Sequence, residues 1–161
     1  GLLLGAKRSD AAVEALERHL EAVPIHAEGY RALARARAAA AGEDGSDGEI
    51  QALVRCLRLN VEHEEARLRL LRVLIARKRY DEALDRVLPH LRIARRKAEF
   101  ALVAAEIHRL RGEPEKARAV LEWGLRHTRG DARLRSALER LEGSAAGDGT
   151  EDHDGHDHEA H

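Results

Sequence analysis

The chain has 161 residues, a length that fits one domain, and its 43% hydrophobic residues suffice for a core of that size. Aromatic residues make up only 2% of the chain, which argues against a β-rich protein because sheets favour aromatic and β-branched side chains. The net charge of −1 argues against a protein that binds nucleic acid or a membrane surface through its overall charge.

The first half of the chain predicts three full helices after a short opening segment. Residues 1–7 are expected to form a reduced opening helix, followed by the second helix of the same unit. A loop rich in Gly and Asp is expected at residues 42–48. The apolar stripes at helical spacing are Ala12, Leu16 and Leu20, then Tyr30, Leu33 and Ala34, then Leu53, Cys56 and Leu57.

The second half predicts two further helical pairs and a last single helix. Gly112 is a stop signal, and Pro114 stands near the first position of a helix, where its missing N–H costs nothing. Asp131 is expected to cap a last helix that ends at Glu142 and covers the end of the stack. The stripes are Ala66, Leu70, Leu71 and Leu74, then Ala83, Leu84, Val87, Leu88 and Leu91, then Ala101, Ala104, Ala105 and His108, then Leu134, Leu138 and Leu141.

These segments repeat with a period of 34 residues, as in the pairs Asp81 and Glu115, and Ala83 and Ala117. A 34-residue unit of helix, turn and helix is the period of tetratricopeptide repeats. Over residues 8–142 the chain resembles that family, through Leu33-Ala34 and Leu70-Leu71 in first helices, small residues in second helices, and Pro24 after a second helix. It departs from the family at several positions: Arg95 and Arg129 replace Pro, Ala101 a large residue, and Glu49 an Ala.

The resemblance implies an all-α fold, a right-handed α-solenoid of about three and a half such units with a C-terminal capping helix. We expect residues 1–142 to form this repeat domain and residues 143–161 a disordered acidic tail rich in His and Asp. The tail carries six acidic and no basic side chains, so residues 1–142, with 28 basic and 23 acidic side chains, are left with +5.

The resemblance also implies that the first helices line a concave groove that binds peptides. Guanidinium groups bind carboxylates in a bidentate manner, so an arginine-lined groove suits an acidic peptide, although the same arginines would equally form a solvated face. The groove positions carried over from the family are Arg31, Arg35, Arg69, Arg72, Glu106 and Arg109. On this reading the chain is not an enzyme but a scaffold for a protein or peptide partner.

The tail supports an alternative function, because imidazole and carboxylate groups are ligands for Zn, Ni, Cu and Co. No cofactor is required, but weak metal binding is expected there, as is an alternative role as a solubilising segment. The candidate ligands are His153, Asp154, His156, Asp157, His158 and His161. His19, Cys56 and His90 occupy equivalent helix positions, but packed helices are too far apart for a shared ion, so we expect them to pack at interfaces.

Other classes of function find little support in the sequence. There is no nucleophile elbow, phosphate-binding glycine loop or zinc-protease motif, which is why catalysis is not expected. Nucleic-acid binding is not expected because stacking aromatic residues are scarce. Cys56 has no partner for an internal disulfide, and no apolar run reaches the length of a membrane span. We expect a cytoplasmic location unless an upstream signal or anchor has been removed; end-to-end association of stacks is left open.

Overall fold

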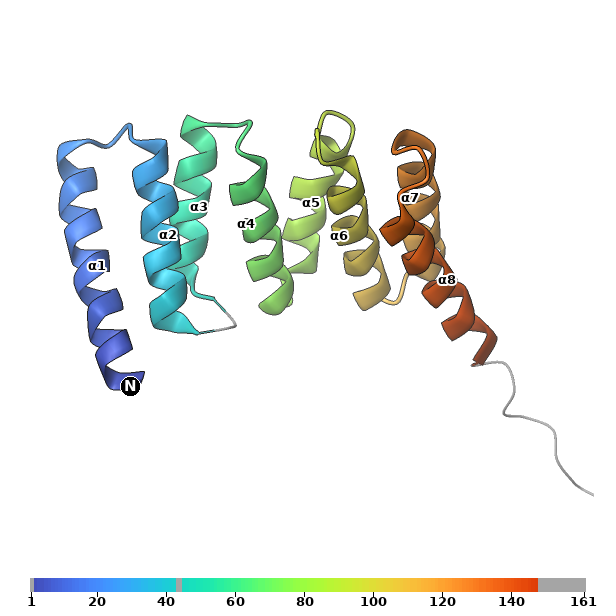
Figure 1. The fold of residues 1–161 in the computed structure, drawn as a ribbon, viewed down its shortest axis with the longest axis horizontal. Helices are drawn as coiled ribbons and strands as arrows, with labels where there is room; N and C mark the ends of the chain where they lie inside the picture. Colours follow the sequence, from blue (N-terminus) through green and yellow to red (C-terminus); the bar gives the residue numbers. More distant parts are fainter. Residues whose placement is uncertain (1, 43–44, 148–161) are drawn as a thin grey trace, which may run out of the picture.

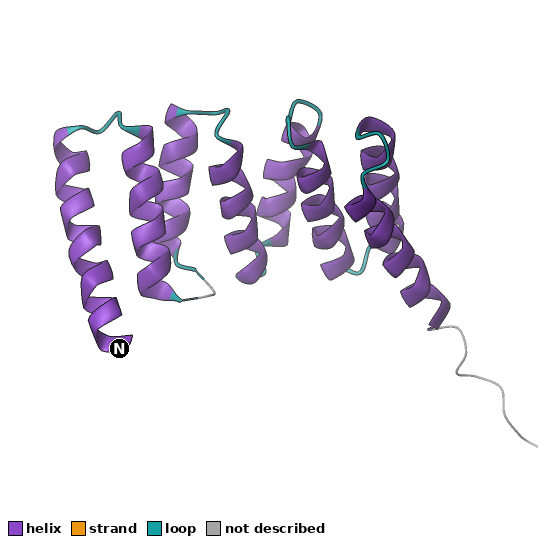
Figure 2. Cartoon of the chain, viewed as in Figure 1, coloured by secondary structure: helices purple, strands orange, loops and turns teal. Residues whose placement is uncertain are grey.

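The computed structural model describes residues 2–42 and 45–147, and these residues form eight α-helices joined by short loops (Figures 1 and 2). Consecutive helices run in opposite directions and pack side by side along the chain. The helices are α1 (Leu2–Ala22), α2 (Ala27–Ala41), α3 (Asp47–Leu59), α4 (Glu64–Ala76), α5 (Tyr80–Leu91), α6 (Lys97–Leu110), α7 (Pro114–His127) and α8 (Ala132–Gly147).

The described part of the chain contains three helical pairs, α2–α3, α4–α5 and α6–α7, with α1 before them and α8 after them. The predicted stack of about three and a half units with a capping helix is thus confirmed. The first helices also contact one another, because α4 packs on α6 and α6 packs on α8. The core lies between the two layers of helices, and its largest buried side chains include Phe100, Leu71 and Leu74.

The prediction of a separate opening helix at residues 1–7 is wrong. These residues, from Leu2 onward, belong to α1, which continues without a break to Ala22. No Pro or Gly interrupts residues 6–22, and the one early hydroxyl, Ser9 Oγ, donates to Gly5 O at 3.1 Å, as a serine inside a helix does. At the other end, α8 extends to Gly147, five residues beyond the predicted end at Glu142.

The loop between α2 and α3 is shorter than the predicted residues 42–48. Ser46 Oγ accepts a hydrogen bond from Glu49 N at 3.0 Å, so Ser46 is the N-cap and α3 begins at Asp47. Gly45, with a φ of 68°, lies where a side chain would clash with Val73 and Glu49. The loop therefore ends at the N-cap Ser46, which the sequence prediction included in an acidic loop.

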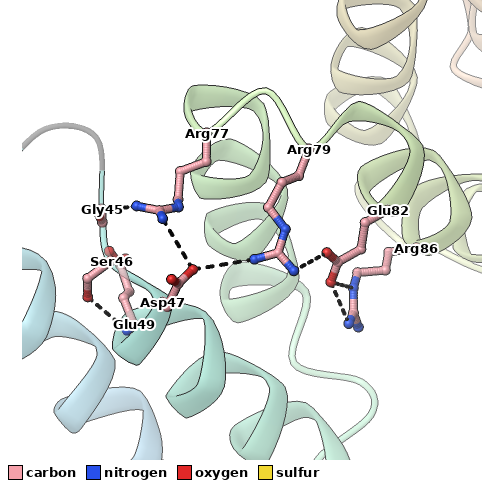
Figure 3. A network of polar contacts seen from close by, with 8 residues as sticks. All are labelled: Gly45, Ser46, Asp47, Glu49, Arg77, Arg79, Glu82 and Arg86. Carbon is pink, nitrogen blue, oxygen red and sulfur yellow. Dashed lines mark hydrogen bonds and ion pairs between the residues drawn. The ribbon is translucent and has the colours of Figure 1, made fainter.

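An ion-pair network joins the α4–α5 turn to the start of α3 (Figure 3). Arg77 Nη2 and Arg79 Nη1 lie 3.3 and 3.5 Å from Asp47 Oδ1, and Arg79 Nη2 lies 2.5 Å from Glu82 Oε2. The contact repeats one unit later, where Arg111 pairs with Asp81. Asp81 and Arg111 each lie 34 residues after Asp47 and Arg77. The same ion pair therefore joins adjacent units at the period predicted from the sequence.

Of the three residues predicted to pack at helix interfaces, two do so. Cys56 is fully buried, and burial foremost raises the pKa of its thiol, which favours an inert thiol. His90 is buried edge-on against Phe100, with ring centroids 4.8 Å apart. The prediction is wrong for His19, which is exposed. Of the described helices, α1 packs mainly on α2, so His19 lies at no interface between units; its Nε2 is 3.0 Å from His26 Nδ1.

Candidate peptide-binding cleft

A cleft of about 940 Å³ lies where α6, α7 and α8 meet. Leu102 on α6, Leu121 on α7 and Leu141 on α8 give it apolar walls. The polar groups around it are the Glu106–Arg109 pair on α6, and Arg140 and Ser144 on α8. An apolar hollow with a few polar groups around it is the usual form of a binding site for a peptide side chain or a small ligand.

Small side chains on α6 and α7 let α8 approach closely enough to complete the cleft. A Cβ atom at Gly124 would lie 2.9 Å from Leu134 Cδ1 and 3.0 Å from Ala101 Cβ. Leu134 is fully buried at this contact. The small residue at Ala101, a departure from the family pattern, thus pairs with Gly124 to seat the capping helix.

Of the two arginines of the cleft, one is in an ion pair and the other is not. Arg109 is held by Glu106 in a bidentate pair, with Nε–Oε2 and Nη2–Oε1 distances of 2.8 and 2.7 Å. Arg140 is exposed and forms no ion pair with any residue that the structure describes. Arg140 therefore presents beside an apolar wall a guanidinium that no acid of residues 2–42 and 45–147 engages.

The predicted groove residues are spread over three helices, and the structure brings only two of them to this cleft. Glu106 and Arg109 line it, whereas the four arginines of the second and third units do not. Arg31 is 2.7 Å from Glu28 Oε2, and Arg69 Nε is 2.5 Å from Glu49 Oε1. Arg35 and Arg72 are exposed and make no ion pair within the described part of the chain.

The site residues predicted from the sequence do not include Arg140, Leu102, Leu121 or Leu141. The sequence predicts the last helix only as a cover for the end of the stack, a role that Leu134 fulfils. Leu141 lies two turns further along α8 and is only partly buried. The signal in the sequence was the length of the apolar stripe of α8, which continues past Leu134 to Leu141, further than the packing of the helix requires.

A second, smaller hollow of about 520 Å³ lies between α5 and α7. His108 is buried at its base, with Nδ1 2.7 Å from Glu113 Oε2, and Lys116 Nζ is 3.0 Å from Glu113 Oε1. These hydrogen bonds, that with His108 foremost, lower the pKa of Glu113 from 4.5 to about 2. Most charges of this hollow are therefore matched by one another, with Arg111 paired to Asp81, while Asp85 makes no ion pair with any described residue.

The predicted metal ligands in residues 153–161 lie outside the described residues. Within residues 2–42 and 45–147, no three His, Cys, Asp or Glu side chains gather closely enough to hold a metal ion. None of the helices in these same ranges is long and apolar enough to cross a bilayer.

Comparison with known proteins supports the fold through structure alone. No family model and no curated protein matches the sequence. Among solved structures the chain is similar to the crystal structure of a thermophilic TPR protein from Thermus thermophilus, with a TM-score of 0.59 and 20% identity over 86% of this chain and 75% of that one. The chain thus has the α-solenoid fold of tetratricopeptide-repeat proteins, which confirms the predicted fold class and resemblance.

Proposed function

We propose that the chain is a non-enzymatic interaction scaffold and that it binds an extended segment of a partner protein in the cleft between α6, α7 and α8. Support comes from the tetratricopeptide-repeat fold and from the packing of α4 on α6 and α6 on α8. First helices that approach one another more closely than second helices do make a stack curve toward the layer of first helices. The first helix α6 and the capping helix α8 both line the cleft, so a bound segment would lie against this inner layer.

The observation that carries the proposal is an apolar wall beside a guanidinium that pairs with no described acid. Leu141 and Arg140 are neighbours on α8, and both line the cleft. A partner segment with an aliphatic side chain and an adjacent carboxylate would fill both features, because Arg binds carboxylates in a planar bidentate geometry. The proposed ligand is therefore an acidic segment that also carries an apolar anchor residue.

Selection from a random peptide library displayed on phage tests this proposal without a known partner. The full chain should enrich peptides that combine Asp or Glu with Leu, Ile or Val, and Arg140→Glu should weaken their binding at least tenfold, as expected for loss of a charge-assisted hydrogen bond of about 1.5–3 kcal/mol. Arg135→Glu is the matched control, since Arg135 is exposed on the same helix outside the cleft.

A second pair of variants locates the site along the stack. Arg35→Ala with Arg72→Ala removes the two exposed arginines predicted for the groove of the second and third units. Undiminished binding by this double variant places the ligand in the α6–α8 cleft alone. Failure to enrich any peptide, or equal binding by Arg140→Glu and Arg135→Glu, contradicts the proposal.

A further inference from the structure

The loops that join successive units all lie along one edge of the molecule, at the top of Figure 1. They are residues 23–26 between α1 and α2, residues 60–63 between α3 and α4, residues 92–96 between α5 and α6, and residues 128–131 between α7 and α8. The loops within units lie at the opposite edge, because consecutive helices alternate in direction. The molecule therefore has two edges of loops, which differ in their exposed apolar side chains and in their ion pairs.

Exposed aliphatic side chains gather at the edge formed by the loops between units. Seven large apolar side chains of the described residues are exposed, and five of them lie in or directly beside these loops. Ile25 is 79% exposed and Ile93 74%. Leu59 and Ile93 lie 34 residues apart, at corresponding places in successive units. Exposed apolar side chains that share one edge of a molecule are a candidate interaction surface. We call the five the apolar row: Val23, Ile25, Leu59, Val61 and Ile93.

The same edge carries arginines whose charges are not matched. Five exposed arginines in these loops and the adjoining helix ends make no ion pair with any described residue: Arg58, Arg92, Arg95, Arg126 and Arg129. In the same loops and helix ends, the exposed acids Glu21 and Glu62 make no ion pair with any described residue. The carboxylate of Glu64 accepts from the backbone N–H groups of Arg95 and Arg96. At the opposite edge, Arg77, Arg79 and Arg111 are all paired with acidic side chains.

We propose that this edge docks on an anionic lipid surface, with the apolar row entering the headgroup region and the unpaired arginines contacting lipid phosphates. Peripheral membrane binding grows with the apolar area that enters the interface and with attraction between basic residues and anionic lipids. Both contributions are present on one edge. The docking is peripheral, because no helix of the described residues could span a bilayer.

The net charge of −1 does not oppose this docking, although taken alone it argued against a membrane-surface protein. Charges are screened over about 8 Å at physiological ionic strength, so a membrane interacts with the charges at the edge that faces it and not with the sum over the chain. A protein partner is the less suitable occupant, because binding hot spots on proteins are rich in Trp and Tyr and the apolar row is entirely aliphatic.

Flotation of the full chain with lipid vesicles tests the proposal. Vesicles of phosphatidylcholine alone are compared with vesicles in which about one lipid in three is phosphatidylglycerol. The chain should bind the anionic vesicles at least roughly tenfold more tightly, and binding should fall as salt is raised. Ile25→Ser with Ile93→Ser, and separately Arg92→Glu with Arg95→Glu, should each weaken binding roughly tenfold or more.

Matched controls change the same chemistry elsewhere on the surface. Leu88→Ser with Leu110→Ser removes the two exposed large apolar side chains outside the row. Lys7→Glu with Arg8→Glu makes the same change of charge near the far end of α1. Both controls should bind vesicles as the unchanged chain does. All substituted residues are exposed, and circular dichroism verifies that each variant keeps its helices.

Two results would overturn the proposal. One is absence of binding to anionic vesicles, or edge variants that bind as tightly as the controls. The other is a dimer, detected by analytical ultracentrifugation without vesicle binding, that dissociates in the Ile25→Ser, Ile93→Ser variant, since the apolar row would then be covered by a second copy of the chain.

Discussion

Glu49 is a buried acid at a position where the two following units have Ala83 and Ala117. Its side chain is 1% exposed; Oε1 accepts from Arg69 Nε at 2.5 Å, while Oε2 is buried without a hydrogen-bond partner among the described atoms. A buried carboxylate is tolerated only when a cation or donors compensate for its lost hydration. Arg69, which the family resemblance placed in the ligand groove, thus has a structural task.

We expect Arg69→Met to lower the free energy of unfolding by about 1–3 kcal/mol, because it leaves Glu49 buried without its partner. The loss should stay at the lower end of that range, since Arg69 is 42% exposed and water screens the pair. Adding Glu49→Ala should recover part of the loss by removing the orphaned charge. Urea unfolding followed by circular dichroism measures both.

Arg72→Met is the matched control, because Arg72 is exposed on the same helix and makes no ion pair among the described residues. Its effect should stay within about 0.5 kcal/mol. Equal stability of the Arg69 and Arg72 variants would show that Glu49 does not depend on Arg69. Binding experiments that substitute Arg69 need this stability measurement beside them.

At the level of elements, the seating of α8 depends on the contact of Gly124 with Ala101 and Leu134. Gly124→Val should lower the free energy of unfolding by about 1–3 kcal/mol, because its side chain would overpack a closed interface against the Cβ of Ala101, which cannot rotate away. Gly143→Val, inside α8 with no neighbouring atom within 4 Å, should change stability by about 0.5 kcal/mol or less. Urea unfolding compares the two, and equal effects would contradict the packing argument.

The helices themselves could be predicted because their signals are local. Apolar spacing and the 34-residue period place the three pairs correctly, with Pro114 at the start of α7 as expected. The errors lie at boundaries, where the deciding contact is a single cap or its absence. Ser46 caps α3 through Glu49 N, and no breaker separates residues 1–7 from the rest of α1.

The candidate site was less accessible from sequence, because it depends on contacts between elements. The family pattern identifies positions on first helices, but Arg69 is engaged by a buried acid and Arg109 by Glu106. Arg140 belongs to the capping helix, where the repeat pattern supplies no expectation. Arg140 and Leu121 line one cleft only because α8 packs on α7.

For the whole molecule, the distribution of charge matters more than its sum. The three arginines of the turns within units are paired, whereas most of those at the edge between units make no ion pair with a described residue. The six acidic residues of the tail follow α8 in sequence without any basic residue among them. Because screening limits each charged group to its neighbours, the loop edge and the paired turns at the opposite edge act independently. The loop edge can therefore serve a partner different from that of the cleft.

The tail is predicted to bind transition metals weakly through its histidines. An imidazole is a metal ligand only in its neutral form. Calorimetry should show uptake of Cu²⁺ and Ni²⁺ more strongly than Zn²⁺ by the full chain, and loss of uptake by a chain ending at Gly147 or by substitution of its four histidines with Ala. Uptake should weaken as pH falls below about 6.5, since protonated imidazole cannot coordinate. The exposed His19–His26 pair, with Nε2 and Nδ1 3.0 Å apart, offers two further imidazoles that a metal ion could bind instead. Uptake that survives truncation and disappears with His19→Ala would assign the metal to that pair and not to the tail.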